Sequence, residues 1–333
     1  MAAARAAGRL GVMTAILTLT LNPALDLAVV TPEVVPGPKL RCTQPKTDPG
    51  GGGVNVSRVI QRLGGDSTAL VALGGPTGAG LEALLRAQAL TLLPFAVSGE
   101  TRISFAVTEG ASGAQYRFVL PGPVWAETDF DRLCAALPEG AAGGIPGGSR
   151  AGIAVLSGSL PPGLTPDHAV RLTRQLDAHG WRIVADTSGP VLAAFCAGDA
   201  PLSVLRMDHA EAEEMAGSPL PERADSARFA AERVAAGAAE TVVVARGPDG
   251  SVAATRDARW HVEAADVPVI SKIGAGDSFV GAFTLALSRG LGLSDALAHG
   301  SAAASATVMT PGTDLCRSDD ALRLVSECPV TAL

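Results

Sequence analysis

The residue types that phosphoryl transfer needs meet in one octapeptide, SKIGAGDS at 271–278. Its two glycines let the chain turn sharply and let the backbone approach a ligand. Because the small-residue segment at 279–287 is predicted to be a helix, the backbone N–H groups at its start lack internal partners and attract anions. Asp277 lies at that start and could accept a proton from a hydroxyl group. A glycine turn in which Asp277 only caps the helix accounts for the same residues, so both interpretations stand at this point.

A second glycine-rich segment, DPGGGGVN at 48–55, precedes a predicted helix at 56–63. Its four consecutive glycines allow the backbone to lie against a ligand, and packing alone explains them poorly. The segment lacks the Gly-Lys-Ser/Thr ending of a Walker loop, so the glycines by themselves are a weak signal. A third loop, SGSLPPG at 157–163, follows a predicted strand and either cradles a ligand or simply turns the chain.

A cationic cluster lies in the segment at 27–47, whose Pro-Gly-Pro centre predicts a hairpin. In a strand, Lys39 and Arg41 would point to the same face, and Lys46 follows them. A neutral ligand gives no reason for such cations, whereas a phosphate does, since arginine can hold it through two parallel hydrogen bonds. The alternative is that these side chains are only solvated surface.

Elements that could position these residues alternate along most of the chain. The apolar run at 16–21 predicts a buried strand, and Asp26 follows it, placed either for a ligand at the strand's carboxyl end or to stabilise a turn. Alternating strands and helices predict a parallel sheet with helices on both faces. Further predicted strands are 69–73, 153–156, 181–186, 202–205, 241–245 and the β-prone run 267–270; predicted helices are 79–88, 167–178, 209–216 and 223–236.

Two parts of the chain depart from this alternation. Strand–turn–strand patterns at 102–108 and 115–120, together with 27–47, predict a small sheet outside the main fold. The segment at 138–150 has the Gly- and Pro-rich composition of a surface linker. Residues 1–14 are expected to be either a wrongly assigned start or a disordered leader before a domain at 15–330.

Composition excludes several classes of function. The 333 residues are 47% hydrophobic and 18% charged, with a net charge of −7 and no basic block, so we expect no nucleic-acid partner. The five scattered cysteines contain no C-x-x-C and favour a reducing, cytoplasmic setting over a disulfide framework or a zinc site. No apolar run reaches the roughly 20 residues of a membrane span, so no membrane partner is expected.

Taken together, these segments resemble the ribokinase-like (PfkB) family of ATP-dependent sugar kinases from about residue 15 to residue 330. The stretch 274–277 resembles the family's C-terminal signature, and 50–55 resembles its N-terminal glycine signature. LTLNPALD at 19–26 is typical of the phosphosugar branch. The segments most similar to PfkB-type 6-phosphofructokinases are 39–42, 49–55, 116–122 and 312–316, and the four-glycine form is informative because 1-phosphofructokinases usually have a lysine there.

The resemblance implies a fold and a set of partners. The fold is a mostly parallel α/β sheet flanked by helices, with a small β lid at about 27–47 and 102–120 that often forms a homodimer interface. It implies ATP and magnesium as cofactors, and a small phosphosugar as the acceptor. The reaction implied is phosphorylation of the 1-hydroxyl of fructose 6-phosphate to fructose 1,6-bisphosphate, a glycolytic step. The alternatives are a tagatose-6-phosphate kinase, a 1-phosphofructokinase, or a catalytically silent sugar- or nucleotide-binding regulator on the same fold.

Roles on the acceptor side follow from the same resemblance. Asp277 would be the general base, and the amides of Gly274, Ala275 and Gly276 would stabilise the transferred phosphoryl group. Arg117 in the lid would reach the site across the dimer. Residues implied to hold the sugar and its phosphate are Asp26, Gly51, Gly52, Gly53, Asn55, Ser159, Lys39, Arg41 and Arg102.

The nucleotide side departs from the family pattern. Where the family often has Lys-Pro-Asn-x-x-Glu, this chain has RMDHAE at 206–211. Glu211 is kept and could orient magnesium through water, whereas Asp208 adds a charge that a cation should screen. Arg246 precedes GPDG at 247–250, where the family usually has a small or apolar residue, and is expected to contact ATP phosphates or to point to solvent. The nucleotide-side residues are Arg206, Asp208, Arg246, Gly247 and Gly250, with Glu211 as the magnesium residue.

Overall fold

The computed structural model describes residues 14–138 and 152–333. The predicted leader, apart from Thr14, and nearly all of the predicted linker at 138–150 lie outside the described residues.

Within the described chain, the main sheet has ten strands in the order β14-β13-β12-β11-β10-β9-β8-β1-β4-β5. The strands from β11 to β5 run parallel to one another, and β12, β13 and β14 add an antiparallel edge. The strands are β1 (Ala15–Thr20), β4 (Thr68–Leu73), β5 (Thr91–Ala96), β8 (Gly152–Ser157), β9 (Trp181–Asp186), β10 (Val204–Asp208), β11 (Thr241–Ala245), β12 (Ser251–Ala254), β13 (Arg259–Val262) and β14 (Val330–Ala332).

Helices cover both faces of this sheet, because successive side chains of each strand enter opposite apolar layers. In β1, Leu17 and Leu19 pack with the layer of α3, α4, α5 and α7, whereas Ile16 packs with the layer of α1, α8, α9 and α10. The helices are α1 (Gly52–Arg62), α2 (Gly75–Ala87), α3 (Glu127–Ala136), α4 (Pro166–Ala178), α5 (Gly189–Cys196), α6 (His209–Ala216), α7 (Arg223–Ala235), α8 (Ala275–Ser288), α9 (Leu293–Val308) and α10 (Ser318–Leu324).

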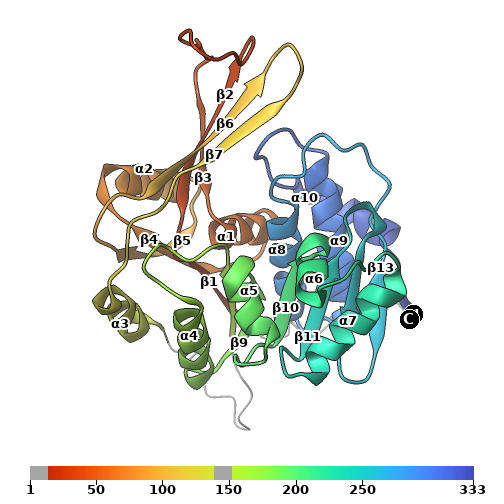
Figure 1. Cartoon of the computed structure of the whole chain (residues 1–333). Helices are drawn as coiled ribbons and strands as arrows, with labels where there is room; N and C mark the ends of the chain where they lie inside the picture. Colours follow the sequence, from red (N-terminus) through yellow and green to blue (C-terminus); the bar gives the residue numbers. More distant parts are fainter. Residues whose placement is uncertain (1–13, 139–151) are drawn as a thin grey trace, which may run out of the picture.

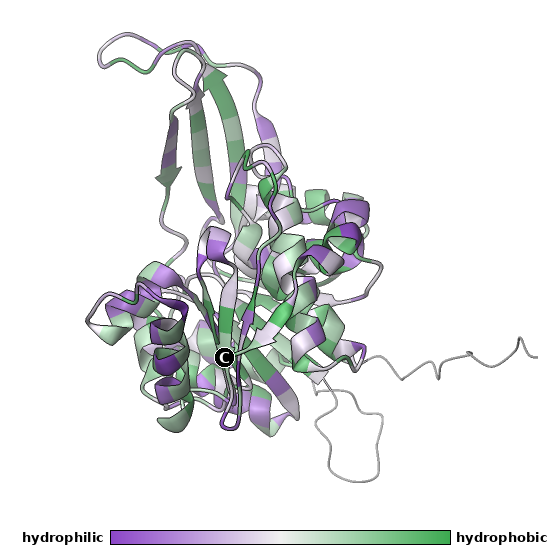
Figure 2. Ribbon diagram, turned by 90° about the vertical axis from the view of Figure 1, so that its right-hand side faces the viewer, coloured by the Kyte–Doolittle hydropathy of each residue, from purple (hydrophilic) through white to green (hydrophobic). Residues whose placement is uncertain are grey.

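A second, smaller sheet rises from the body in Figure 1 and stands clear of it in Figure 2 as well. Its order is β3-β2-β6-β7, with β2 and β6 parallel and the outer pairs antiparallel. The strands are β2 (Ala24–Thr31), β3 (Lys46–Gly50), β6 (Arg102–Glu109) and β7 (Gln115–Val119).

The register gives the small sheet two unlike faces. One face carries Asp26, Asp48, Arg102, Ser104 and Arg117. That face is tied to the body, because Asp48 Oδ2 accepts a hydrogen bond of 2.7 Å from the Thr313 hydroxyl. The opposite face is apolar, and its side chains are Leu27, Val29, Phe105, Val107, Tyr116 and Phe118.

The predicted strand–helix alternation and the predicted small-sheet strands are confirmed, and two local predictions are wrong. The run 267–270 forms no strand; instead Ile270 N donates to Val308 O at the end of α9, at 2.7 Å, so its apolar residues line a loop. In the hairpin at 27–47 the strand ladder ends at Ala28 and Lys46, and beyond it Thr43 N donates to Val30 O at 2.9 Å. Between the ends of β2 and β3, residues 32–45 form a loop that contains Lys39 and Arg41, so strand alternation does not place these two cations on one face.

Candidate functional site

The start of α8 has the geometry of an anion-binding turn. Gly274 has a φ of +78°, and a Cβ there would lie 2.8 Å from Leu315 Cδ2, so the turn requires glycine. Among the described residues, no side chain caps this helix. The amide of Ala275 is directed at Lys272 O at 3.4 Å, so the first-turn amides open to a ligand are those of Gly276 and Asp277.

Asp277 is held by a hydrogen bond rather than used as a helix cap. Asn55 Nδ2, from α1, donates to Asp277 Oδ2 at 2.8 Å. Asn55 is in turn oriented by Arg58, whose buried guanidinium donates to Asn55 Oδ1 at 3.1 Å and to Pro49 O at 3.3 Å. Thus α1 fixes the orientation of a carboxylate that belongs to α8.

The environment of Asp277 favours its neutral form. Burial, and then the nearby charge of Asp186, raise its pKa from 3.8 to about 7, while the hydrogen bond from Asn55 and the charge of Arg206 oppose that rise. A carboxylate with a pKa near neutral pH can accept a proton and release it again, which suits a general base.

The four glycines at 50–53 are required because the chain packs closely against the ends of neighbouring strands. A Cβ on Gly50 would collide with the Asp26 carboxylate, and one on Gly52 with the Ser157 hydroxyl. A Cβ on Gly53 would lie 2.6 Å from Leu19 O. Close packing therefore accounts for these glycines, contrary to the interpretation from the sequence that packing alone explains them poorly. The same packing brings the start of α1, with Asn55, to the carboxyl ends of β1 and β8.

A cavity of about 480 Å³ adjoins the start of α8. Ala275 and Gly276 form one wall, and Gly247 and Gly250 form another. Most of the lining is apolar, with a few polar side chains such as Lys272, as expected for a site that binds a flat ring at one end and charge at the other. Lys272 was not among the sequence candidates, although it belongs to the octapeptide that was singled out first.

Arg206 connects this cavity to a carboxylate that the sequence analysis missed. Its NH1 lies 2.9 Å from Asp186 Oδ1, and a Cβ on Gly276 would lie 3.0 Å from the same nitrogen. Asp186 ends β9 beside Ser157 of β8 and Arg206 of β10. The charge of Asp186 also acts on the pKa of Asp277. An acid at the end of the predicted strand 181–186 was the sole signal for it in the sequence.

The small sheet brings a second titratable carboxylate to the site. Asp26 lies within β2 and not directly after β1, which corrects its predicted position. Burial raises its pKa from 3.8 to about 6, against the charge of Arg102, a hydrogen bond with Ser104 and the charge of Arg117. The charge of Arg117 therefore acts on Asp26 of its own chain, and its reach across a dimer stays a prediction.

Ser159 and Arg102 are joined through one asparagine. Asn22 Nδ2 donates to Ser159 Oγ at 3.1 Å, and Arg102 Nε donates to Asn22 O at 3.1 Å. The loop after β8 and the first residue of β6 thus meet at the base of the small sheet. By contrast, Lys39 and Arg41 are exposed in the loop 32–45.

Two of the nucleotide-side candidates have other contacts. Asp208 is the N-cap of α6: its Oδ1 accepts from Glu211 N at 2.9 Å, and Glu211 Oε2 accepts from Asp208 N at 2.8 Å. Neither residue lines the cavity. Arg246 neither reaches the cavity nor points to solvent, since its side chain is 7% exposed and bound to protein acceptors. The expected orientation toward solvent is therefore wrong, and the structure gives no support to a contact with ATP phosphates.

A parallel sheet covered on both faces, with an anion-binding helix start and a protonatable carboxylate at its strand ends, is the arrangement of an α/β phosphotransferase. Comparisons with known proteins agree. Residues 20–320 match the family described as pfkB family carbohydrate kinase. The chain therefore belongs to the pfkB family of carbohydrate kinases and is a sugar kinase.

The curated relatives include two named ATP-dependent 6-phosphofructokinase isozyme 2. The one from Mycobacterium tuberculosis is 39% identical over 92% of this chain and 88% of its own length. The one from Escherichia coli is 37% identical over 94% of this chain and 98% of its own length. A 1-phosphofructokinase from Xanthomonas campestris is 32% identical over 93% of this chain and 94% of its own length.

Solved structures of phosphofructokinase-2 from Escherichia coli share the fold at 36% identity. The complex with fructose 6-phosphate has a TM-score of 0.84, covering 94% of this chain and 99% of that one. A form described as tetrameric and inhibited has a TM-score of 0.85 over the same shares of the two chains. Membership of a kinase family implies that ATP is a substrate.

No helix in residues 14–138 or 152–333 is long and apolar enough to cross a membrane. Over the same ranges, no three His, Cys, Asp or Glu side chains come together as a ready-made metal site.

Proposed function

We propose that this chain transfers the γ-phosphoryl group of ATP to the 1-hydroxyl of fructose 6-phosphate. The observation that carries the proposal is the hydrogen bond of 2.8 Å that holds Asp277 at the open start of α8, beside the cavity. The names of the relatives at 37–39% identity support the choice of acceptor.

In the proposed mechanism, Asp277 accepts the proton of the attacking hydroxyl group. Asn55 keeps one carboxylate oxygen occupied, which leaves the other free for that hydroxyl. The amides of Gly276 and Asp277 and the guanidinium of Arg206 offset the charge that gathers on the transferred phosphoryl group. Asp26, at the base of the small sheet, would accept hydrogen bonds from hydroxyls of the sugar.

We further propose that magnesium accompanies ATP and lies at the Arg206 side of the cavity, next to carboxylates that do not themselves line it. The donor set fits this ion, because magnesium in kinases is held mainly by phosphate oxygens and water, with one or two carboxylates. The carboxylates that would serve are Asp186, whose Oδ1 lies 2.9 Å from Arg206 NH1, and Glu211, which would act through water. Removal of divalent cations with EDTA should abolish turnover, and added magnesium should restore it; activity that persists in EDTA would exclude the requirement.

A second copy of this chain is proposed to cover the apolar face of the small sheet. Phe105, Tyr116 and Phe118 are exposed on that face, and Phe118 is 54% exposed. Phe118→Asp should lower the molar mass measured by light scattering. The matched control is Leu322→Asp, a residue of α10 that is 56% exposed and lies outside the small sheet. A mass unchanged by Phe118→Asp would place any interface elsewhere.

A panel of sugar phosphates assayed with ATP tests the proposed reaction. Fructose 6-phosphate should give fructose 1,6-bisphosphate with the highest kcat/KM. Preference for fructose 1-phosphate would support a 1-phosphofructokinase instead, and preference for tagatose 6-phosphate would support a tagatose-6-phosphate kinase. The relative named 1-phosphofructokinase favours the former of these two alternatives. No turnover with any phosphosugar would favour the silent regulator, although the intact pairing of Asn55 with Asp277 argues against it.

A further inference from the structure

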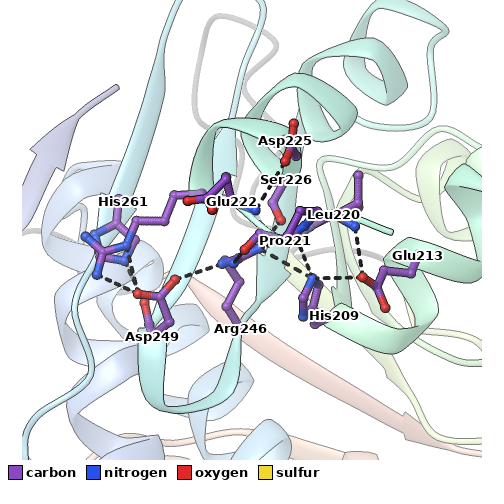
Figure 3. Close-up of polar contacts among 11 residues, drawn as sticks. His209, Glu213, Leu220, Pro221, Glu222, Asp225, Ser226, Arg246, Asp249 and His261 are labelled. Carbon is purple, nitrogen blue, oxygen red and sulfur yellow. Dashed lines mark hydrogen bonds and ion pairs between the residues drawn. The ribbon is translucent and has the colours of Figure 1, made fainter. Parts of the chain in front are cut away.

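Arg246, with a side chain that is 7% exposed, is the centre of the partly buried polar cluster drawn in Figure 3. Its Nε donates to Asp249 Oδ2 at 2.9 Å. On the side away from Asp249, NH1 donates to Leu220 O at 3.0 Å and NH2 donates to Pro221 O at 2.7 Å. NH1 also donates to Ser226 Oγ at 2.5 Å, in the first turn of α7. One guanidinium therefore joins the turn after β11 to the connection between α6 and α7.

The turn that Arg246 holds forms part of the cavity wall. Gly247 and Gly250 line the cavity, and the turn between them is closed by Gly250 N donating to Gly247 O at 3.0 Å. Gly250 has a φ of +81°, and a Cβ there would collide with Val262 O, so no side chain can anchor the turn at that position. Asp249 has the one polar side chain within the turn, and its carboxylate accepts the hydrogen bond from Arg246 Nε.

The other contacts of Asp249 hold a different side of the turn. The exposed side chain of Arg223 donates to Asp249 Oδ1 at 2.8 Å. The ring of His261, on β13, donates from Nε2 to Asp249 O at 2.6 Å. These two contacts fix the turn to the start of α7 and to the antiparallel edge of the sheet. Of the side chains described here that contact the turn, Arg246 also donates to carbonyl groups of the α6–α7 connection.

The cluster extends to the helix that bears Glu211. His209, the first residue of α6, donates from Nε2 to Leu220 O at 2.8 Å, the same oxygen that Arg246 contacts. Leu220 N donates to Glu213 Oε1 of α6 at 2.8 Å. The α6–α7 connection is thus fastened to α6 on one side and to Arg246 on the other.

We infer that Arg246 is a positioning residue of the nucleotide site: it sets the placement of the Gly247–Gly250 turn relative to α6 without touching the nucleotide. This inference rests on the proposed function, because it takes the cavity to be the place where ATP binds. Substitution of Arg246 should therefore change the KM for ATP and leave the KM for the sugar unchanged, since the acceptor-side residues Asp26 and Asn55 lie on β2 and α1.

The test compares Arg246→Met with wild type at a temperature at which both are folded. Met keeps the length of the stem and removes all four donated hydrogen bonds. Loss of these charge-assisted hydrogen bonds should let the Gly247–Gly250 turn move, and the KM for ATP should rise by about tenfold or more. The KM for fructose 6-phosphate should stay within about twofold. Arg246→Lys keeps the charge and should fall between the two enzymes. If Arg246→Met does not fold, Arg246→Lys and Asp249→Asn carry the same comparison.

The control is Arg228→Met. Arg228 is 65% exposed on α7 and pairs with Asp225 three residues away, the same spacing as Arg246 and Asp249. It should leave both KM values unchanged. A purely structural role would lower the melting temperature of Arg246→Met and leave the KM for ATP unchanged, or raise both KM values in proportion; either result overturns the inference.

Direct binding separates this inference from the proposed function. ATP alone, without sugar, should raise the melting temperature of wild type and of Arg228→Met, and should raise that of Arg246→Met much less. Failure of ATP to stabilise wild type would refute the proposed function, and this inference with it. Equal stabilisation of wild type and Arg246→Met would refute only the inference.

Discussion

The hydrogen bond from Asn55 should determine the pH at which the enzyme loses activity. Asp277 must be ionised to accept a proton, and its pKa of about 7 places the acid limb of kcat/KM near neutral pH. Asn55→Leu keeps the approximate shape of the side chain and removes the donor 2.8 Å from Asp277 Oδ2. Because that bond stabilises the ionised form, its loss should raise the pKa of Asp277.

The size of the effect follows from the strength of such bonds. A hydrogen bond to a charged group contributes about 1.5–3 kcal/mol, and one pKa unit corresponds to about 1.4 kcal/mol, so the pKa should rise to about 8–9. At pH 7 the ionised fraction would fall from about one half to about 1–10%, a loss of roughly 5- to 50-fold that disappears at high pH.

The assay is the pH profile of kcat/KM for fructose 6-phosphate at saturating ATP. A lost sugar contact would lower the whole profile, whereas the proposed effect moves its acid limb to higher pH. Asp186→Asn provides the opposite sign, since the charge of Asp186 raises the pKa of Asp277 and its removal should move the limb to lower pH. An acid limb that stays in place in both variants would refute this account of Asp277.

Three further predictions concern stability and specificity. The pKa of Asp277 in the folded protein is raised from 3.8 to about 7, so the stability that the neutral carboxyl contributes is lost as pH rises through 7. The unfolding free energy that Asp277→Asn gains over wild type should therefore grow by about 2–3 kcal/mol between pH 5 and pH 8, measured by urea unfolding. A gain independent of pH would contradict this. Asp208→Ala should cost about 1 kcal/mol of unfolding free energy and Asp208→Asn almost nothing, because Asp208 caps α6; equal losses would argue against the cap. Arg41→Ala tests the phosphate role that the family resemblance implies for this exposed side chain. The kcat/KM for fructose 6-phosphate should fall by roughly ten- to a hundred-fold without further loss for unphosphorylated fructose, and equal losses for both sugars would remove Arg41 from phosphate binding.

The sequence predicted those parts of the site that depend on local backbone chemistry. Glycines before a small-residue helix predicted the turn at Gly274 correctly, because a sharp turn and an open helix start are properties of adjacent residues. Asp186 could not be found in this way, because its place beside Arg206 and Ser157 depends on the register of β8, β9 and β10. The sequence also could not show why Gly50 and Gly52 are needed, since the colliding groups come from β2 and β8.

Arg246 shows a second limit of sequence reasoning. Two of its acceptors are the backbone carbonyls of Leu220 and Pro221, which carry no signature in the sequence. An arginine before a glycine-rich turn therefore suggested a phosphate contact. The cations of the small sheet show the same limit, because the position of Lys39 and Arg41 depends on where pairing between β2 and β3 stops.

The turnover of Asp277→Asn tests the central claim most directly. The substitution keeps the shape of the side chain and removes its ability to accept a proton. Turnover with ATP and fructose 6-phosphate should fall by roughly 10²–10⁴-fold, while the affinities for both ligands, measured by calorimetry, should stay close to those of wild type. Turnover within about threefold of wild type would contradict the assignment of Asp277 as the general base.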